Sequence, residues 1–223
     1  MSDKKSQEKR AKRKDKDLLI IFVKNIILGK VKTRLAKRIG AIGAFKIYSE
    51  LAGITEKATS NIKADRHIYF SDAIISSKWK GGKKFVQEGE DLGIKMQNAF
   101  QNGFEEGYEN ILLIGSDLPD ISKEIIDSGF ESLAKNDVVF GPAEDGGYYL
   151  IGMSKMNPSI FKDKPWSQSE LLTITLAQLK EQQQSVGLIK TLNDIDTFED
   201  LIDSHFYKNN PKVKEIIEKK IQL

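Results

Sequence analysis

The stretch Ile111-Leu-Leu-Ile-Gly-Ser-Asp-Leu-Pro-Asp120 places four consecutive apolar residues directly before a short acidic turn. An unbroken apolar run of this length predicts a strand buried on both faces, as in a parallel sheet covered by helices. Ligands bind such sheets outside the carboxyl ends of the strands, where Asp117 would lie. Gly115 permits close approach of the backbone, Ser116 can orient a neighbour by hydrogen bond, and Pro119 ends the strand. The alternative is an ordinary strand-to-helix turn in which Asp117 caps a helix.

Length and composition narrow the class of protein. A chain of 223 residues can bury a full core as one domain, and no repeat or linker divides it. No apolar run approaches about eighteen residues and the N-terminus lacks an apolar signal core, so we expect a cytoplasmic protein without a membrane span. The sequence has no cysteine and two histidines, so thiolate and histidine-based metal sites are excluded. Any metal would be held by oxygen ligands.

The N-terminal 17 residues are strongly basic. They carry eight Lys/Arg against four Asp/Glu, a surplus of +4, so the net charge of +3 leaves about −1 for the remaining body. We expect residues 1–17 to form a flexible, solvated extension and residues 18–223 to form one domain. Binding of the extension to nucleic acid or a membrane surface is the alternative. The body carries no nucleic-acid signature, so no nucleic-acid partner is expected.

A second apolar run, LLIIFV at residues 18–23, predicts another strand, and a basic loop follows it. Cations in a strand-to-helix loop, with helix amides behind them, suit a di- or triphosphate. The loop lacks the order and spacing of a Walker motif. A solvated basic surface is the alternative. The residues expected to bind phosphate are Lys24, Gly29, Lys30, Lys32 and Arg34.

Helical and extended patterns alternate along the rest of the chain. Asp91 is expected to cap a helix whose buried face includes Leu92 and Met96. Gly89 and Gly93 make the backbone thin at the entrance of that helix, which indicates that another segment packs there. We expect helices at about 43–61, 92–107, 122–135 and 170–182, and from 211 onward. Residues 166–169 would cap the helix at 170–182. Strands are expected at 67–70, 137–141, 148–152 and 187–192.

Two further loops concentrate acidic residues at strand ends. Pro142-Ala-Glu-Asp-Gly-Gly-Tyr-Tyr-Leu-Ile-Gly152 joins two carboxylates to paired glycines, which indicates a loop bent sharply over a ligand; a plain hairpin turn is the alternative. Asn193-Asp-Ile-Asp-Thr-Phe-Glu-Asp200 follows the strand predicted at 187–192. A second acidic cluster therefore lies at a predicted strand end.

Six motifs in order resemble the glycosyltransferase-A-type nucleotide-diphospho-sugar transferases, specifically the bacterial group called uncharacterised transferase 1. The resemblance covers about residues 18–202 and extends to phospholactate guanylyltransferase and, more distantly, molybdenum-cofactor nucleotidyltransferases. It implies an α/β fold of three α/β/α layers with a mixed, mostly parallel sheet. The motifs are GKVKTRLA, EDLGIKMQNAF, GSDLPD, GPAEDGGYYLIG, PWSQSELL and NDIDTFEDL.

The resemblance also implies a site. Asp117 would ligate Mg²⁺ or Mn²⁺ bridging the nucleotide phosphates, with Asp196 as the second ligand and Asp194 in reserve. Asp145 would act beside them, bordering the acceptor or sugar. The chain departs from its relatives in having Ile26 and Leu28 where prolines are common, and in lacking a glycine-rich run in that loop. Further residues expected at the nucleotide or sugar are Asp91, Gly93, Ser116, Gly146 and Gly147.

A cation-lined site of this kind stabilises charge on departing phosphates whichever bond breaks. If a nucleoside diphosphate leaves, the protein transfers a glycosyl group from a nucleotide-sugar to a small-molecule acceptor, which we favour because the glycine-rich run is missing. If pyrophosphate leaves, it transfers a nucleotide from a nucleoside triphosphate to a phosphorylated small molecule. A non-enzymatic nucleotide-binding protein of the same fold is the third possibility.

Overall fold

The computed structural model describes residues 16–221. The expected N-terminal extension therefore lies almost wholly outside the described residues, and its flexibility stays a prediction. Only Lys16 and Asp17 of it are described, and Asp17 already belongs to the first strand. In the described part of the chain no helix combines the length and apolar character needed to cross a membrane.

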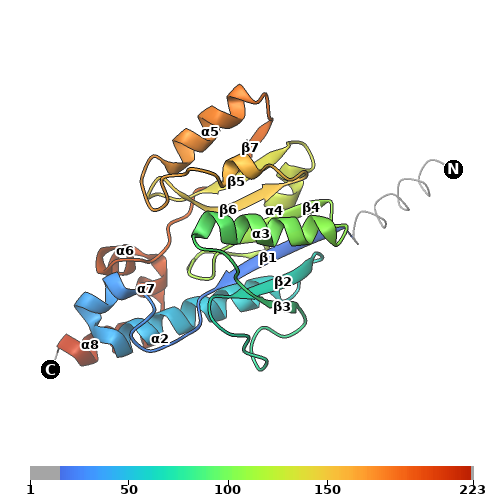
Figure 1. Cartoon of the computed structure of the whole chain (residues 1–223). Helices are drawn as coiled ribbons and strands as arrows, with labels where there is room; N and C mark the ends of the chain where they lie inside the picture. Colours follow the sequence, from blue (N-terminus) through green and yellow to red (C-terminus); the bar gives the residue numbers. More distant parts are fainter. Residues whose placement is uncertain (1–15, 222–223) are drawn as a thin grey trace.

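A seven-stranded sheet in the order β3-β2-β1-β4-β6-β5-β7 forms the middle of the molecule (Figure 1). Strand β6 runs antiparallel to both of its neighbours, while every other adjacent pair is parallel. The predicted mixed, mostly parallel sheet is therefore confirmed. The strands are β1 (Asp17–Val23), β2 (Asp65–Phe70), β3 (Lys83–Val86), β4 (Asn110–Ile114), β5 (Val138–Pro142), β6 (Tyr148–Met153) and β7 (Val186–Leu188).

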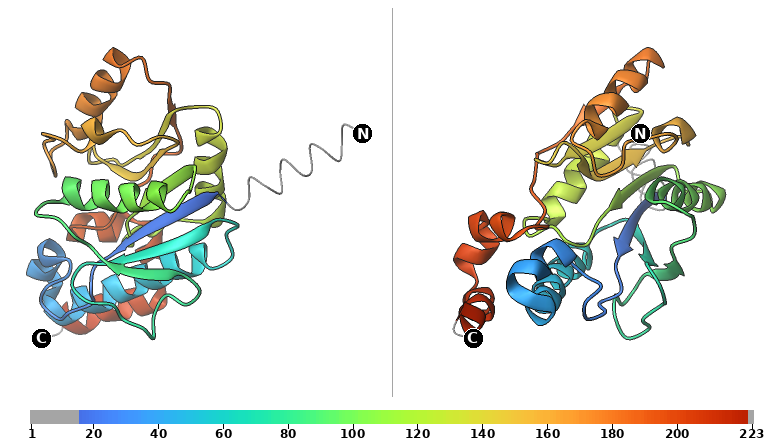
Figure 2. Two further views of the ribbon diagram at one scale, coloured as in Figure 1. Left: turned by 45° about the vertical axis from the view of Figure 1, so that its right-hand side comes forward. Right: turned by 60° about the vertical axis from the view of Figure 1, so that its left-hand side comes forward.

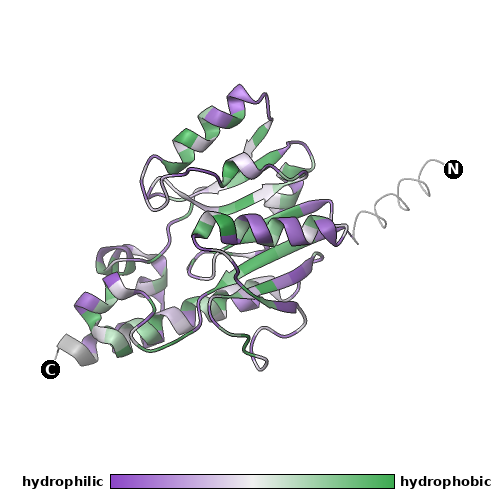
Figure 3. Ribbon diagram, in the orientation of Figure 1, coloured by the Kyte–Doolittle hydropathy of each residue, from purple (hydrophilic) through white to green (hydrophobic). Residues whose placement is uncertain are grey.

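Helices cover both faces of the sheet. On one face, Leu19 and Ile21 of β1 join a core cluster with α2 (Thr33–Thr59) and α4 (Lys123–Leu133). On the other, Leu18 and Ile20 join a cluster with α3 (Leu92–Glu105) and α5 (Leu171–Glu181). Successive side chains of a strand point to opposite faces, which explains why the runs in β1 and β4 are apolar throughout (Figure 3).

Three short helices after β7 pack against α2 rather than against the sheet (Figure 2). They are α6 (Phe198–Asp203), α7 (His205–Asn209) and α8 (Pro211–Ile221). Val213 and Ile217 of α8 are buried in a third apolar cluster that also holds Ile195, from the acidic segment after β7. The C-terminal helices therefore anchor that segment to α2.

Several predicted helix starts are confirmed. Asp91 caps α3 by accepting a 2.8 Å hydrogen bond from the Ile94 amide, and Ser122 caps α4. The amide of Lys212 donates to the side chain of Asn210 at the start of α8. The cap predicted at residues 166–169 is wrong, because α5 begins after Glu170 without a side-chain hydrogen bond.

Other boundaries also differ from the predictions. Helix α2 starts ten residues earlier than expected, at Thr33, and continues through a break at Gly40, whose φ of 76° leaves the helical region. Leu92 is 46% exposed rather than buried. Strand β7 is shorter than expected. Strand β3 and the short helices α6 and α7 were not predicted; β3 is a half-buried edge strand with two lysines, so its apolar pattern is weak.

Candidate functional site

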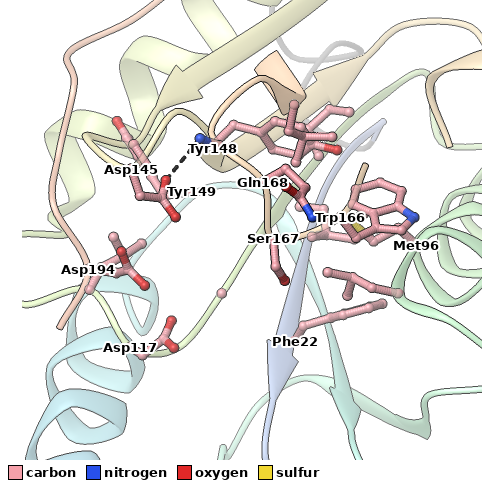
Figure 4. A pocket seen from close by; sticks show the side chains of 18 residues that line it. Phe22, Met96, Asp117, Asp145, Tyr148, Tyr149, Trp166, Ser167, Gln168 and Asp194 are labelled. Carbon is pink, nitrogen blue, oxygen red and sulfur yellow. Dashed lines mark hydrogen bonds between the residues drawn. The ribbon is translucent and has the colours of Figure 1, made fainter. Parts of the chain in front are cut away.

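A cavity of about 240 Å³ lies at the carboxyl edge of the parallel strands. The ends of β1, β4 and β6, the first turns of α3 and the loop before α5 surround it. Because β6 is antiparallel, its first residue Tyr148 lies at the same edge as the last residues of β4. Three carboxylates from three different loops, Asp117, Asp145 and Asp194, lie on one side, and Phe22, Met96 and Trp166 lie on the other (Figure 4).

Asp117, at the end of the central strand β4, is paired with a lysine. The Nζ atom of Lys32 lies 2.9 Å from Asp117 Oδ2, and the Lys32 side chain is only 4% exposed. Burial alone would raise the pKa of Asp117, but the Lys32 ammonium lowers it below its ordinary value. Asp117 is therefore ionised at neutral pH. It is not the helix cap of the alternative interpretation, since the cap of α4 is Ser122.

Lys32 is held in an uncommon backbone conformation at the start of α2. Its φ of 47° and ψ of 53° lie in the left-handed region, which costs a non-glycine residue about 1–3 kcal/mol. Its ammonium also approaches Asp196 Oδ1 at 3.9 Å. In this conformation Lys32 forms its ion pairs with Asp117 and Asp196, so one positive charge lies inside the acidic cluster.

The carboxylate of Asp194 is less well compensated by positive charge than that of Asp117. Burial, followed by the negative charge of Asp117, raises the pKa of Asp194 to about 6 although Lys32 acts in the opposite direction. Asp145 accepts a 2.9 Å hydrogen bond from the Gly147 amide, which fixes its carboxylate at the cavity. The carboxylates therefore outnumber the cations at this end of the cavity.

The acidic loop after β5 is held close to the loop before α5. Gly146 has a φ of 87°, and a Cβ atom there would lie 2.0 Å from the carbonyl oxygen of Ser169. Glycine is thus required at position 146 both by conformation and by space. The loop joins the antiparallel strands β5 and β6, so it is the turn of a hairpin, as the alternative interpretation had it. It is also sharply bent, and Gly147 lines the cavity, whereas its position over a ligand stays a prediction.

Asp196, the expected second metal ligand, does not line the cavity. Its Oδ2 atom forms a 3.0 Å ion pair with Arg34 Nη1. The reserve candidate, Asp194, faces the cavity together with Asp117. Ligation of a metal by Asp196 stays a prediction, but the geometry favours Asp194.

The remaining residues of the basic loop lie outside the cavity. Lys24, Gly29 and Lys30 are exposed at the loop after β1, and Arg34 is bound to Asp196. Phosphate binding by this group stays a prediction. Only Lys32 of the predicted cations has its ammonium inside the acidic cluster.

Ser116 positions the strand ends rather than facing the cavity. The hydroxyl groups of Ser116 and Tyr48 lie 2.8 Å apart, and the Lys24 amide donates to the same tyrosine oxygen at 2.9 Å. Burial raises the pKa of Tyr48 to about 12, so the phenol stays protonated. This network ties the ends of β1 and β4 together below Asp117.

Gly93 is where another segment packs on α3, as its spacing from Gly89 predicted. A Cβ atom at Gly93 would lie 2.6 Å from both the carbonyl oxygen of Phe161 and Cζ2 of Trp166. Asp91 itself caps the helix and does not line the cavity. Trp166 was expected only as part of a helix cap, and Tyr148 had no expected role, although both line the cavity. Their aromatic side chains, inside quoted motifs, would have been the signal.

The donor set is compatible with a hard divalent ion. Among residues 16–221 no three acidic or histidine side chains converge closely enough to form a complete metal site. Mg²⁺ in proteins, however, commonly uses one or two carboxylates together with substrate phosphates and water. Asp117 and Asp194 supply two carboxylates to one cavity, and burial together with the charge of Asp117 raises the pKa of Asp194. The residues therefore fit Mg²⁺ or Mn²⁺.

Comparison with known proteins relates this chain to a bacterial family. The family model described as "Uncharacterized protein conserved in bacteria (DUF2064)" matches residues 55–168, which is more than half of the chain. No curated protein matches the sequence. The matched segment includes β4 with Asp117 and the acidic loop with Asp145.

Solved structures share the whole fold. A candidate nucleotide-diphospho-sugar transferase from Desulfovibrio desulfuricans G20 superimposes with a TM-score of 0.81 at 28% identity, covering 92% of this chain and 98% of that one. 4-diphosphocytidyl-2C-methyl-D-erythritol synthase from Anaerococcus prevotii DSM 20548 has a TM-score of 0.58 at 13% identity, with coverage of 88% and 100%. A cytidylyltransferase from Leptospira borgpetersenii serovar Hardjo-bovis (strain JB197) has a TM-score of 0.52 at 16% identity, with coverage of 93% and 96%. The last two share the fold alone.

Proposed function

We propose that this chain, which belongs to the DUF2064 family of bacterial proteins, is a metal-dependent nucleotide-diphospho-sugar transferase. It moves a glycosyl group from a nucleotide-sugar to a small-molecule acceptor. The observation that carries this proposal is the convergence of Asp117, Asp145 and Asp194 on one cavity, beside the buried cation Lys32. The likeness to the Desulfovibrio desulfuricans protein supports it.

The residues at the acidic end of the cavity have separate roles in this proposal. Asp117 and Asp194 would hold Mg²⁺ or Mn²⁺, which when bound neutralises charge on the departing phosphates. Lys32 contributes a fixed positive charge in a poorly solvated place, where it stabilises developing negative charge more strongly than in water. Asp145, held by the Gly147 amide, is placed to accept a hydrogen bond from the acceptor hydroxyl.

The basic loop supports glycosyl transfer over nucleotidyl transfer. Residues 24–32 contain a single glycine, Gly29, and thus lack the repeated glycines that cradle a triphosphate with backbone amides. Nucleotidyl transfer with release of pyrophosphate is the second candidate, because cytidylyltransferases share this fold. The products distinguish the two reactions.

Thermal unfolding of the purified protein with nucleotide-sugars and nucleoside triphosphates, with and without Mg²⁺, tests the proposal. A ligand that binds only the native state raises the melting temperature with its saturation. The best nucleotide-sugar should stabilise the protein only when Mg²⁺ is present, and turnover should then release a nucleoside diphosphate.

A matched pair of variants locates the effect. Asp145→Asn should lower turnover severely, whereas Glu144→Gln, a change at the exposed neighbour outside the cavity, should not. Release of pyrophosphate would support the nucleotidyl alternative. Absence of stabilisation by every nucleotide would contradict both reactions.

A further inference from the structure

Ser167, in the loop before α5, has an unfavourable backbone conformation at the cavity. Its φ of 63° lies in the left-handed region, which residues with a Cβ atom rarely adopt. Five residues other than glycine have a positive φ in the described part of the chain, and of these Ser167 alone lines the cavity. Backbone strain of this kind concentrates at functional sites.

The conformation of Ser167 belongs to a tight turn. The Gln168 amide donates a 3.2 Å hydrogen bond to the carbonyl oxygen of Pro165, so Ser167 is the third residue of a four-residue turn. A positive φ at the third position alone is typical of a type II turn, in which glycine is preferred there. Glycine would form the same turn with less strain. The shape of the turn therefore does not explain the serine.

Packing on both sides fixes the turn in place. The ring of Trp166 occupies the space left by the missing side chain of Gly93, where a Cβ atom would lie 2.6 Å from Cζ2. The carbonyl oxygen of Ser169 packs on Gly146 in the acidic loop. The turn is thus held between α3 and the acidic loop. A group on a fixed turn loses little freedom when it binds a ligand.

The hydroxyl of Ser167 is accessible and free to bind. The residue is exposed, and its side chain forms no hydrogen bond within residues 16–221. Figure 4 shows the hydroxyl directed into the cavity, which Asp117, Asp194 and Phe22 also line. A hydroxyl can donate one hydrogen bond and accept others.

The lining around Ser167 suits a sugar ring. Phe22, Met96 and Trp166 supply apolar surface, while Ser167 and Gln168 supply a hydroxyl and an amide. A sugar ring presents C–H groups on its faces and hydroxyls at its rim, so it needs walls of both kinds. A cavity of about 240 Å³ is small among ligand sites and has room for a single ring rather than for a whole nucleotide-sugar.

The proposed reaction brings the transferred sugar to the same place. A metal on Asp117 and Asp194 would hold the diphosphate, and Asp145 would hold the acceptor hydroxyl. The reacting carbon of the sugar lies between these two groups, because it is bonded to the diphosphate before transfer and to the acceptor afterwards. All three carboxylates border the cavity that Ser167 lines.

We propose that Ser167 is a specificity-determining residue, whose hydroxyl hydrogen-bonds a hydroxyl of the transferred sugar. The sugar would lie against Phe22 and Trp166, with its diphosphate at the metal. This inference rests on the proposed function for the identity of the ligand. The fixed turn and the free hydroxyl rest on the structure alone.

The test measures binding by titration calorimetry with Mg²⁺ present. The probes are glucose linked to uridine, guanosine, adenosine, cytidine and thymidine diphosphates, and the same diphosphates without glucose. Ser167→Gly and Ser167→Ala should each weaken binding of the glucose-linked nucleotides about threefold to tenfold, the effect of one neutral hydrogen bond, and leave binding of the diphosphates unchanged. Equal losses for both kinds of probe would assign Ser167 to the phosphates or the base and overturn the inference. Unchanged binding of both kinds would also overturn it.

Stability separates the hydroxyl from the fold. Ser167→Gly should not lower the melting temperature, because glycine takes the left-handed conformation without strain. The control is Asp163→Gly, at an exposed residue of the same loop that has a φ of 53° but does not line the cavity. This variant should bind the glucose-linked nucleotides as the wild type does. A loss of affinity equal to that of Ser167→Gly would show that loop flexibility causes the effect, and would contradict the role of the hydroxyl.

Deoxy analogues of the glucose identify the contacted hydroxyl. The analogue that lacks it should bind the wild type about threefold to tenfold more weakly, but should bind Ser167→Ala as well as the intact ligand does. If every analogue affects both proteins equally, Ser167 makes no direct contact. Absence of binding by every nucleotide in the wild type would refute the proposed function and this inference together. Binding of a nucleotide-sugar that all Ser167 variants retain in full would refute this inference alone.

Discussion

Replacing Asp194 by asparagine tests the electrostatics of the acidic end. Burial and the charge of Asp117 raise the pKa of Asp194 to about 6 in the folded protein, against an ordinary value of 3.8. An acid whose pKa is raised by folding stabilises the native state when protonated, and this stability is lost as the pH rises from about 4 to about 6. A difference of about two pKa units corresponds to about 3 kcal/mol, since one unit is about 1.4 kcal/mol.

The assay is urea unfolding of the wild type and Asp194→Asn between pH 4 and pH 7.5. Asparagine keeps the volume but cannot ionise, so it escapes the cost of a buried charge. The unfolding free energy of the variant relative to the wild type should therefore grow by up to about 3 kcal/mol across this range, and then stay constant. Near neutral pH this corresponds to about 6–12 °C in melting temperature for a domain of this size.

The control is Asp120→Asn, which removes an exposed carboxylate at the same edge of the sheet but outside the cavity. The unfolding free energy of Asp120→Asn should stay close to that of the wild type over the same pH range. If the difference for Asp194→Asn is equally flat, burial beside Asp117 does not raise the pKa of Asp194, and the electrostatic argument for this carboxylate is refuted. Added Mg²⁺ should stabilise the wild type at pH 7 more than Asp194→Asn, because the ion removes the repulsion between Asp194 and Asp117.

Three further substitutions probe the site. Asp117→Asn should fold, since neighbouring carboxylates still face Lys32, but nucleotide with Mg²⁺ should no longer stabilise the variant. If that stabilisation persists in thermal unfolding, Asp117 is not a metal ligand. Lys32→Met should cost about 1–3 kcal/mol by urea unfolding, because it removes a charged hydrogen bond from Asp117, whose side chain is 27% exposed. Arg34→Met breaks an exposed pair and should cost below about 1 kcal/mol. Equal costs would refute the role of the Lys32 pair. Gly93→Ala should lower the free energy of unfolding by about 1–3 kcal/mol through overpacking, and it should change the fluorescence of Trp166. A variant with wild-type stability and emission would show that the packing is loose.

The sheet was largely predictable because its central strands have a strong local signal. The runs in β1 and β4 are apolar on both faces, which occurs where helices cover both sides of a sheet. The start of α3 was also predictable, because Asp91 caps it by a local hydrogen bond. The early start of α2 was not, since Lys32 lies in a left-handed conformation and offers no side-chain cap.

The site was predictable at the level of its loops but not of its individual contacts. The carboxyl ends of parallel strands meet at one edge, where Asp117 was expected, and the family resemblance added Asp145 to the same site. Asp194 and Asp196 are two residues apart, and no local pattern tells which one faces the cavity; the buried Ile195 between them, packed on α2, decides it. The burial of Lys32 likewise depends on tertiary packing.

The anchoring of Ile195 by the C-terminal helices has a consequence for synthesis of the chain. Val213 and Ile217 complete the cluster that holds this residue, and with it Asp194, against α2. During translation, β1, β4 and the acidic loop after β5 leave the ribosome well before these residues do. We therefore expect a nascent chain to form its sheet early and to fix Asp194 fully only after α8 has emerged. Ribosome-bound chains arrested before Val213 should be folded in part and inactive, so that an incompletely translated protein cannot consume substrate.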